Sequence, residues 1–184
     1  MSDPVQFEAF LRHYQDLVYT TALRLVGRAA EAEDIAQEAF LKAYEHFDEL
    51  AASPTAAGWL KTVARNLALN HLTRYRNRWR FFSELESEED AEPGRTFADT
   101  LAAPETHQHT LDTADQREIL EAALQALPAA QRVPLVLYHF ENLSYEEIAA
   151  RLKVSLGKVK TDIHRGREAL RRRLRLKHPD LQSP

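Results

Sequence analysis

The chain has 184 residues, a net charge of -4 and a hydrophobic content of 44%, so it suits one medium domain or two small ones and is too apolar to be wholly disordered. It contains no cysteine, no apolar run near the roughly 18 residues that span a bilayer and no signal-peptide pattern, which excludes disulfides, thiol chemistry, cysteine-ligated zinc, export and membrane insertion. Alanine (27) and leucine (25) far outnumber valine and isoleucine (12 together), so we expect an all-α protein of the cytoplasm.

The first expected domain covers residues 5–80 and is a bundle of three amphipathic helices. Gly27 is expected to end the first helix, and residues 48–58 are predicted to form a loop because they contain proline, serine and glycine. The apolar stripes of three helices can close a small core by packing on one another. Apolar residues recur at helical spacing in three stretches, 7–26, 35–47 and 59–72.

Charges are sorted along the chain. Residues 61–80 hold six basic residues and no acidic one, whereas residues 81–118 hold eleven acidic residues against two basic ones. Residues 151–184 then carry eleven basic and three acidic residues. Two separate cationic segments of this kind are typical of polyanion binding, although a solvated helix face carries similar runs.

An acidic flexible linker is expected over residues 83–112. This stretch contains the sequence SELESEEDAEPG and two prolines, and it is too polar to bury a core. His107 and His109 are spaced by one residue, but no helix orients them and no cysteine accompanies them. We therefore expect neither a metal nor a cofactor.

The second expected domain covers residues 113–177 and contains a helix-turn-helix. Ser144 and Glu147 have the spacing of a capping box at a helix start, and Ser155 can cap the helix that follows. Six arginines lie between positions 165 and 175, more than solubility requires. This density favours contacts with phosphates, and the alternative is an ordinary helical hairpin with a solvated basic face.

Three parts of the sequence together resemble bacterial extracytoplasmic-function (ECF, group 4) sigma factors. The fourth conserved region of that family is similar to LPAAQRVPLVLYHFENL, LSYEEIAARL and KVSLGKVKTDIHRGREAL. The family's core-polymerase-binding helix resembles DIAQEAFLKAY at 34–44, and its promoter-melting segment resembles GWLKTVARNLALNHLTRYRNR at 58–78. The order and spacing of these segments agree over nearly the whole chain.

The resemblance implies a protein that binds core RNA polymerase, directs it to promoter DNA through the −35 and −10 elements, helps to melt the DNA and catalyses nothing itself. It also implies control by an anti-sigma factor and a part in a stress response. A dimeric helix-turn-helix repressor is the main alternative. A sigma mimic is disfavoured because 184 residues leave no room for the receiver domain that such mimics carry. An enzyme is the least favoured hypothesis, because the sequence shows no nucleophile with a base and no glycine-rich phosphate loop.

The resemblance also assigns residues to three contacts. The residues that match the helix docking on the clamp of the largest polymerase subunit are Asp34, Gln37, Glu38 and Phe40. The residues assigned to the −10 element are Asn66, Asn70, His71, Arg74, Tyr75 and Arg78. The residues assigned to the −35 element are Ser155, Lys158, Lys160, Thr161, His164, Arg165 and Arg167.

Some of these positions have alternatives. Phe40 lies on an apolar stripe and fits the core equally well. Lys153 stands where the family's turn usually has glycine, and Asn70 stands in place of an aspartate. Asp162 stands where arginine is common, and it could accept from a cytosine amine, pair with Arg165 or point away from DNA.

Overall fold

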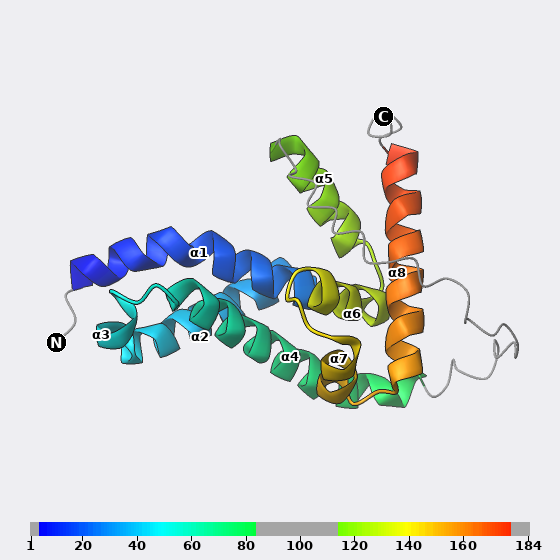
Figure 1. Ribbon diagram of the computed structural model, residues 1–184, viewed down its shortest axis with the longest axis horizontal. Coiled ribbons are helices and arrows are strands. Elements are labelled where there is room, and N and C mark those ends of the chain that lie inside the picture. Colours follow the sequence, from blue (N-terminus) through cyan, green and yellow to red (C-terminus); the bar gives the residue numbers. More distant parts are fainter. Residues whose placement is uncertain (1–3, 84–113, 178–184) are drawn as a thin grey trace, which may run out of the picture.

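The computed structural model describes residues 4–83 and 114–177, with side chains over 4–74 and 116–176. Within these ranges every regular element is a helix, which confirms the all-α prediction. None of the described helices combines the length and the apolar character needed to span a bilayer. The N-terminal half contains α1 (Pro4–Val26), α2 (Ala29–Glu45), α3 (Phe47–Leu50) and α4 (Ala56–Ser83), and the C-terminal half contains α5 (Ala114–Gln125), α6 (Ala129–His139), α7 (Tyr145–Leu152) and α8 (Leu156–Lys177) (Figure 1).

Helix α1 ends at Val26, and Gly27 follows it as predicted. The backbone of Gly27 has φ of +78°, in the left-handed region that favours glycine, and its N–H donates to the Leu23 carbonyl at 2.8 Å. A Cβ atom added at Gly27 would lie 2.5 Å from the guanidinium of Arg132. The left-handed turn therefore favours glycine here, and the guanidinium of Arg132 would have to shift to admit a larger residue.

The predicted loop at 48–58 was wrong at both ends. Phe47 and Leu50 are buried, so the chain stays helical after α2 and forms the short helix α3. At the other end α4 begins at Ala56, and the Ser53 hydroxyl accepts from the Thr55 N–H at 3.2 Å just before it. The N-terminal half therefore has four helices where three were expected.

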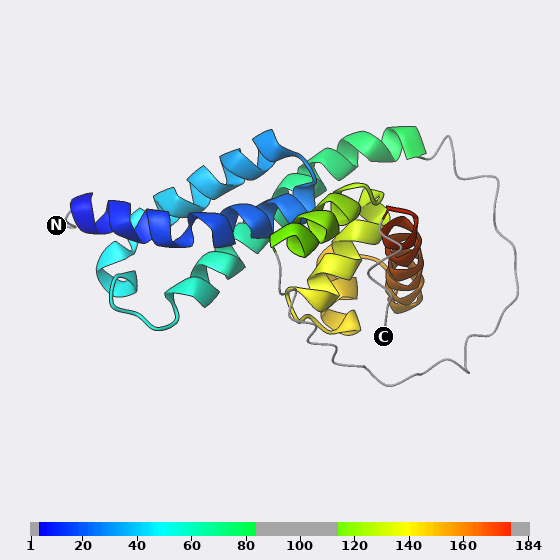
Figure 2. The ribbon, with the colours of Figure 1, turned by 90° about the horizontal axis from the view of Figure 1, so that it is seen from above.

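The buried side chains form two clusters. One lies within the N-terminal half and contains Phe10, Phe40 and Leu60, with Trp59 packed against it. The other joins the two halves, because Leu25 of α1 packs in the same cluster as residues of α6, α7 and α8. Figures 1 and 2 show the C-terminal half seated against one end of the N-terminal bundle, beside the later turns of α4. The independent domains expected at 5–80 and 113–177 stay a prediction, and the expected linker lies outside the described residues except for the last residue of α4.

The helix-turn-helix is formed by α7 and α8 with the caps that the sequence predicts. The Ser144 hydroxyl accepts from the Glu147 N–H at 3.2 Å, and the Glu147 carboxylate accepts from the Ser144 N–H at 2.8 Å. These hydrogen bonds lower the pKa of Glu147. Lys153 ends α7 with φ of 54°, and the Ser155 hydroxyl accepts from the Lys158 N–H at 3.2 Å at the start of α8.

Candidate nucleic-acid and protein interfaces

Helix α2 exposes a face that is both acidic and apolar. Asp34, Gln37 and Glu38 are exposed, as the sequence predicts for a docking surface. One turn further on, Leu41 is 68% exposed. These four residues recur at intervals of three and four positions and so share one side of the helix. We name Asp34, Gln37, Glu38 and Leu41 the α2 outer face, and an exposed leucine among carboxylates suits a protein partner.

Phe40 lies in the core and not on the α2 outer face. Its side chain is 7% exposed and packs in the N-terminal cluster with Phe10 and Phe47. The structure therefore shows the core alternative for Phe40. Leu41 was not among the predicted docking residues. The sequence nevertheless held a signal for it, because Leu41 falls off the apolar stripe that Ile35 and Phe40 define.

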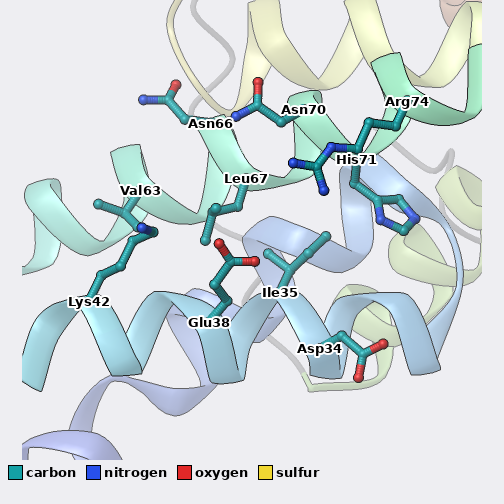
Figure 3. Close-up of a pocket in the computed structure, with 10 residues that line it drawn as sticks. All are labelled: Asp34, Ile35, Glu38, Lys42, Val63, Asn66, Leu67, Asn70, His71 and Arg74. Carbon is teal, nitrogen blue, oxygen red and sulfur yellow. The ribbon is translucent and has the colours of Figure 1, made fainter.

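A groove of about 420 Å³ between α2 and α4 brings together residues that the sequence assigned to two different partners. Figure 3 shows Glu38 pointing from α2 toward α4, whereas Asp34 points away from α4. Asn66 and Asn70 point away from α2 in the same view. Helix α4 contributes to the lining Asn66, Asn70, His71 and Arg74. Tyr75 and Arg78 belong to α4, but their side chains lie outside the described ones.

The first basic residues of α4 are covered by the C-terminal half. Lys61 Nζ donates to the Phe140 carbonyl oxygen at 2.5 Å and lies 3.4 Å from Glu141 Oε1. Arg65 Nη1 lies 3.7 Å from Glu141 Oε2. Burial raises the pKa of Glu141, and the charges of Lys61 and Arg65 act in the opposite direction. Part of the positive charge on α4 is therefore already neutralised within the chain.

Two residues assigned to the −10 element also form contacts within the chain. Arg151 of α7 donates from Nη1 to Asn66 Oδ1 at 3.2 Å. His71 Nε2 lies 3.2 Å from Glu31 Oε2 of α2. Arg151 and Glu31 were not among the predicted site residues. No local pattern marks either contact, because the partners are 85 and 40 positions apart in the chain.

The basic residues in the first turns of α8 are exposed. Val159 and Ile163 are each 1% exposed and pack in the joint cluster. On the opposite side, Lys160 and Arg165 are exposed. The exposed side chains of the predicted −35 set also include Ser155, Lys158, Thr161 and His164. One side of the helix is thus anchored while the other can enter a groove.

Asp162 does not share that outward side. It is 9% exposed, and its Oδ2 lies 2.9 Å from Lys158 Nζ on the preceding turn. Of the three alternatives for Asp162, the structure shows a residue that points away from the outward side, and its partner is Lys158 and not Arg165. The acid therefore does not lie among the exposed side chains of α8.

Arg167 is held inside the C-terminal half. Its Nε donates to His139 Nε2 at 3.1 Å, and its guanidinium lies 5.5 Å from the centre of the Tyr138 ring. Burial lowers the pKa of His139, and the positive charge of Arg167 lowers it further. Arg167 therefore packs α8 on α6, which sets it apart from the exposed Lys160 and Arg165.

Two family models match the chain. The family model for sigma-70 region 2 matches residues 10–79, and the family model for sigma-70 region 4 matches residues 117–170. The first match contains the α2 outer face and α4 up to its later turns. The second contains the helix-turn-helix.

Curated relatives match along most of the chain. The ECF RNA polymerase sigma factor SigW of Bacillus subtilis is 35% identical over 168 residues, which are 88% of this chain and 85% of the relative. The RNA polymerase sigma-H factor of Pseudomonas aeruginosa is 33% identical over 91% of this chain and 86% of the relative. A solved structure of the sigma factor RpoE in complex with the anti-sigma factor NepR, from Bartonella quintana, covers 92% of this chain and 96% of its own at 22% identity, with a TM-score of 0.47. The two regions and the full-length relatives show that the chain belongs to the ECF sigma factors, which bind core RNA polymerase and recognise promoter DNA.

Proposed function

We propose that the chain divides promoter-specific initiation among three surfaces. The α2 outer face docks on core RNA polymerase, the later part of α4 takes the −10 element, and the first turns of α8 read the −35 element. The observation that carries this proposal is the orientation of α8, whose apolar side is buried while Lys160 and Arg165 are exposed.

The geometry of α8 supports the proposed contact with the −35 element. The major groove of B-DNA is wide enough to admit an α-helix. The N-terminus of α8 carries the positive end of the helix dipole, and Ser155 orders this end by capping it. Lys160 and Arg165 then contribute contacts to phosphate or guanine, which are the usual partners of these side chains. Ser155 acts as a cap and not as a base-reading residue.

The contact with core polymerase uses charge and one apolar anchor. Asp34 and Glu38 supply negative charge that steers a basic partner. Leu41 supplies apolar area at the same face, where burial against a partner contributes affinity. Phe40 supports this face from beneath through its place in the core.

The contact with the −10 element uses polar and cationic groups on the outer side of α4. Asn70 and Arg74 are exposed, and the amide and guanidinium suit base edges and phosphates. Extruding a base from the stack costs a few kcal/mol, which such contacts must offset. Asn66 joins this set once its hydrogen bond to Arg151 is broken.

Other parts of the proposal rest on family membership alone. We propose that the chain acts in the cytoplasm, has no catalytic activity of its own, responds to stress and is controlled by an anti-sigma factor. A pull-down from the native host with the full chain as bait tests the last point, since an anti-sigma factor would be recovered in competition with core polymerase.

Site-specific photo-crosslinking in the assembled holoenzyme tests the three surfaces. A crosslinking amino acid is placed at Leu41, Asn70 or Lys160, one position at a time, and the complex is formed on promoter DNA. We expect crosslinks to the largest polymerase subunit from position 41, to the non-template strand of the −10 element from position 70, and to the −35 duplex from position 160. Crosslinks from position 160 to polymerase alone, or from position 41 to DNA, would contradict the assignment.

A further inference from the structure

Leu156, the first residue of α8, exposes apolar area that the fold does not use. Its side chain is 36% exposed, whereas Val159 and Ile163 further along the helix are each 1% exposed. Among the described residues it belongs to neither of the two apolar clusters. A single exposed leucine is common on protein surfaces, so the surroundings of Leu156 decide what it indicates.

Gly157, the next residue, is a glycine that its place in the fold does not require. Its backbone is helical and its φ lies outside the left-handed region, unlike that of Gly27. Apart from its chain neighbours and the backbone of α8, a Cβ atom added here would meet no heavy atom of the described residues within 4 Å. Glycine destabilises a helix relative to alanine, and it is used where a backbone approaches a ligand closely.

Gly157 lies in the middle of the exposed side of α8. Its neighbours on the helix surface, three and four positions further on, are the exposed Lys160 and Thr161. Val159 is two positions away, so it points in nearly the opposite direction, and it is buried. If α8 enters a groove with its exposed side foremost, the backbone of Gly157 comes closest to the bases.

Two polar side chains near Gly157 already have partners within α8. The Thr161 hydroxyl donates to the Gly157 carbonyl oxygen at 3.0 Å. Lys158 Nζ lies 2.9 Å from Asp162 Oδ2. The first turn of α8 therefore presents an aliphatic side chain, Leu156, beside an open stretch of backbone.

The charges around Leu156 favour DNA as its partner. Lys158 and Lys160 are both exposed, one on each side of the buried Val159 in the sequence, and lysines attract a polyanion. Leu41 of the α2 outer face, by contrast, lies among carboxylates. In the major groove of DNA the C5-methyl group of thymine is the apolar group that base edges present. An exposed leucine on a helix of this charge therefore matches thymine.

We propose that Leu156 and Gly157 together read a thymine of the −35 element. The Leu156 side chain packs on the C5-methyl group of the base. Because Gly157 has no side chain, the backbone of α8 comes close enough to the base edge for this contact. This inference rests on the proposed function, since it adds a base preference to the contact between α8 and the −35 element.

Selection of promoter DNA by the holoenzyme tests the base preference. Core polymerase carrying the full chain selects duplexes from a library that is randomised over the length of a promoter. We expect the wild type to enrich thymine at one position of the −35 element, on either strand. Leu156→Ala should lose this enrichment and keep the other enriched positions, because Lys160 and Arg165 are unchanged.

Two further variants serve as matched controls. Leu156→Met keeps an aliphatic side chain and should retain the thymine. Leu176→Ala removes a leucine that is 79% exposed near the end of the same helix, and it should select the wild-type sequence. Thermal unfolding of each full chain shows that the variants are folded.

Removal of the methyl group alone makes the test specific. The selected duplex is synthesised with uracil in place of the thymine, which deletes the C5-methyl group and keeps the hydrogen-bonding groups. Uracil should weaken binding of the wild-type holoenzyme by about fourfold, as expected for one buried methyl group. It should leave binding of the Leu156→Ala holoenzyme unchanged, since the methyl group then has no partner. Equal losses in both would contradict the contact.

Gly157→Ala should change folding and DNA binding in opposite directions. Alanine favours the helix, so the midpoint of thermal unfolding of the full chain should rise by about 2–4 °C. The added methyl group holds the backbone away from the bases, so the holoenzyme should bind the selected duplex at least about fivefold more weakly. An unchanged affinity would contradict the close approach of Gly157.

The selection also separates this inference from the proposed function. Thymine enrichment that persists in Leu156→Ala, or a wild-type −35 sequence without an enriched thymine, would overturn the inference. A Leu156→Ala chain with weaker binding to core polymerase and unchanged DNA preferences would assign Leu156 to a protein contact and overturn it as well. A wild-type holoenzyme that enriches no sequence in the −35 region would overturn the proposed function instead.

Discussion

Helices α2 and α8 each bury one side and expose the other, but their exposed sides differ in charge. The α2 outer face carries Asp34, Glu38 and the exposed Leu41. The exposed side chains of α8 include lysine and arginine, and α8 also leaves Leu156 36% and Leu176 79% exposed. An apolar residue among acids suits a protein surface, whereas cations suit phosphates. A helix with one buried side can therefore present either kind of exposed surface.

The largest expected effect is on the free energy of unfolding. It contrasts alanine substitutions at two adjacent positions of α2, one on the buried side and one on the exposed side. Phe40→Ala should lower the free energy of unfolding by about 3–5 kcal/mol, because it leaves a cavity in the core. Leu41→Ala should change it by no more than about 0.5 kcal/mol, because the side chain is exposed. Urea unfolding measures both. A stable Phe40→Ala chain with impaired polymerase binding would place the anchor at Phe40 instead.

The next effect concerns affinity for polymerase. The double charge reversal Asp34→Lys with Glu38→Lys should weaken binding of core polymerase by about 100-fold, since two attractive charges become repulsive. Binding of a −35 duplex by the same chain should be unchanged. The neighbouring reversal Glu33→Lys, also on an exposed residue of α2, is the control. Equal losses for the double variant and the control would show a general charge effect and no docking face.

A smaller effect is expected on the exposed side of α8. Arg165→Ala or Lys160→Ala should weaken binding of the −35 duplex by about tenfold and lower the slope of affinity against salt by about one. Arg12→Ala, which removes an exposed arginine from α1, should leave both quantities unchanged. Titrations at several salt concentrations measure the slope. A slope that is the same in all three variants would remove these side chains from the interface.

The smallest effect concerns the inner side of α8, where Arg167 donates to His139. The pKa of His139 is lowered in the folded chain, so the unfolded chain takes up a proton at a higher pH, near the ordinary value of about 6.5. Stability should therefore be complete above about pH 6.5 and should fall by less than about 1 kcal/mol as the pH drops below it. Thermal unfolding of His139→Gln should lose this dependence. The same pH dependence in the variant would assign it to another group.

The sequence predicted most of α8 and less of α4 for a physical reason. The cap at Ser155, the break at Lys153 and the buried Val159 all follow from residues a few positions apart. The contacts that cover part of α4 are made by Glu141 and Arg151, which lie more than seventy positions from their partners in the sequence. No local pattern shows which basic face meets an acid from elsewhere in the chain.

The candidate sites show the same limit at single residues. Periodicity placed Phe40 on the apolar stripe but left two interpretations, and only the packing decided between them. Asp162 likewise had three interpretations, and none of them named Lys158, which the structure places beside it. The family resemblance agrees with the family models that match residues 10–79 and 117–170, whereas the direction of each side chain required the structure.

Transcription with purified core polymerase tests the central claim most directly. Wild-type chain is mixed with core enzyme and a template that carries both promoter elements, and the 5′ end of the transcript is mapped. The account predicts a single defined start that disappears when Asp34 and Glu38 are both changed to lysine. Transcripts without a defined start, or a chain that does not co-elute with core polymerase at low ionic strength, would contradict it.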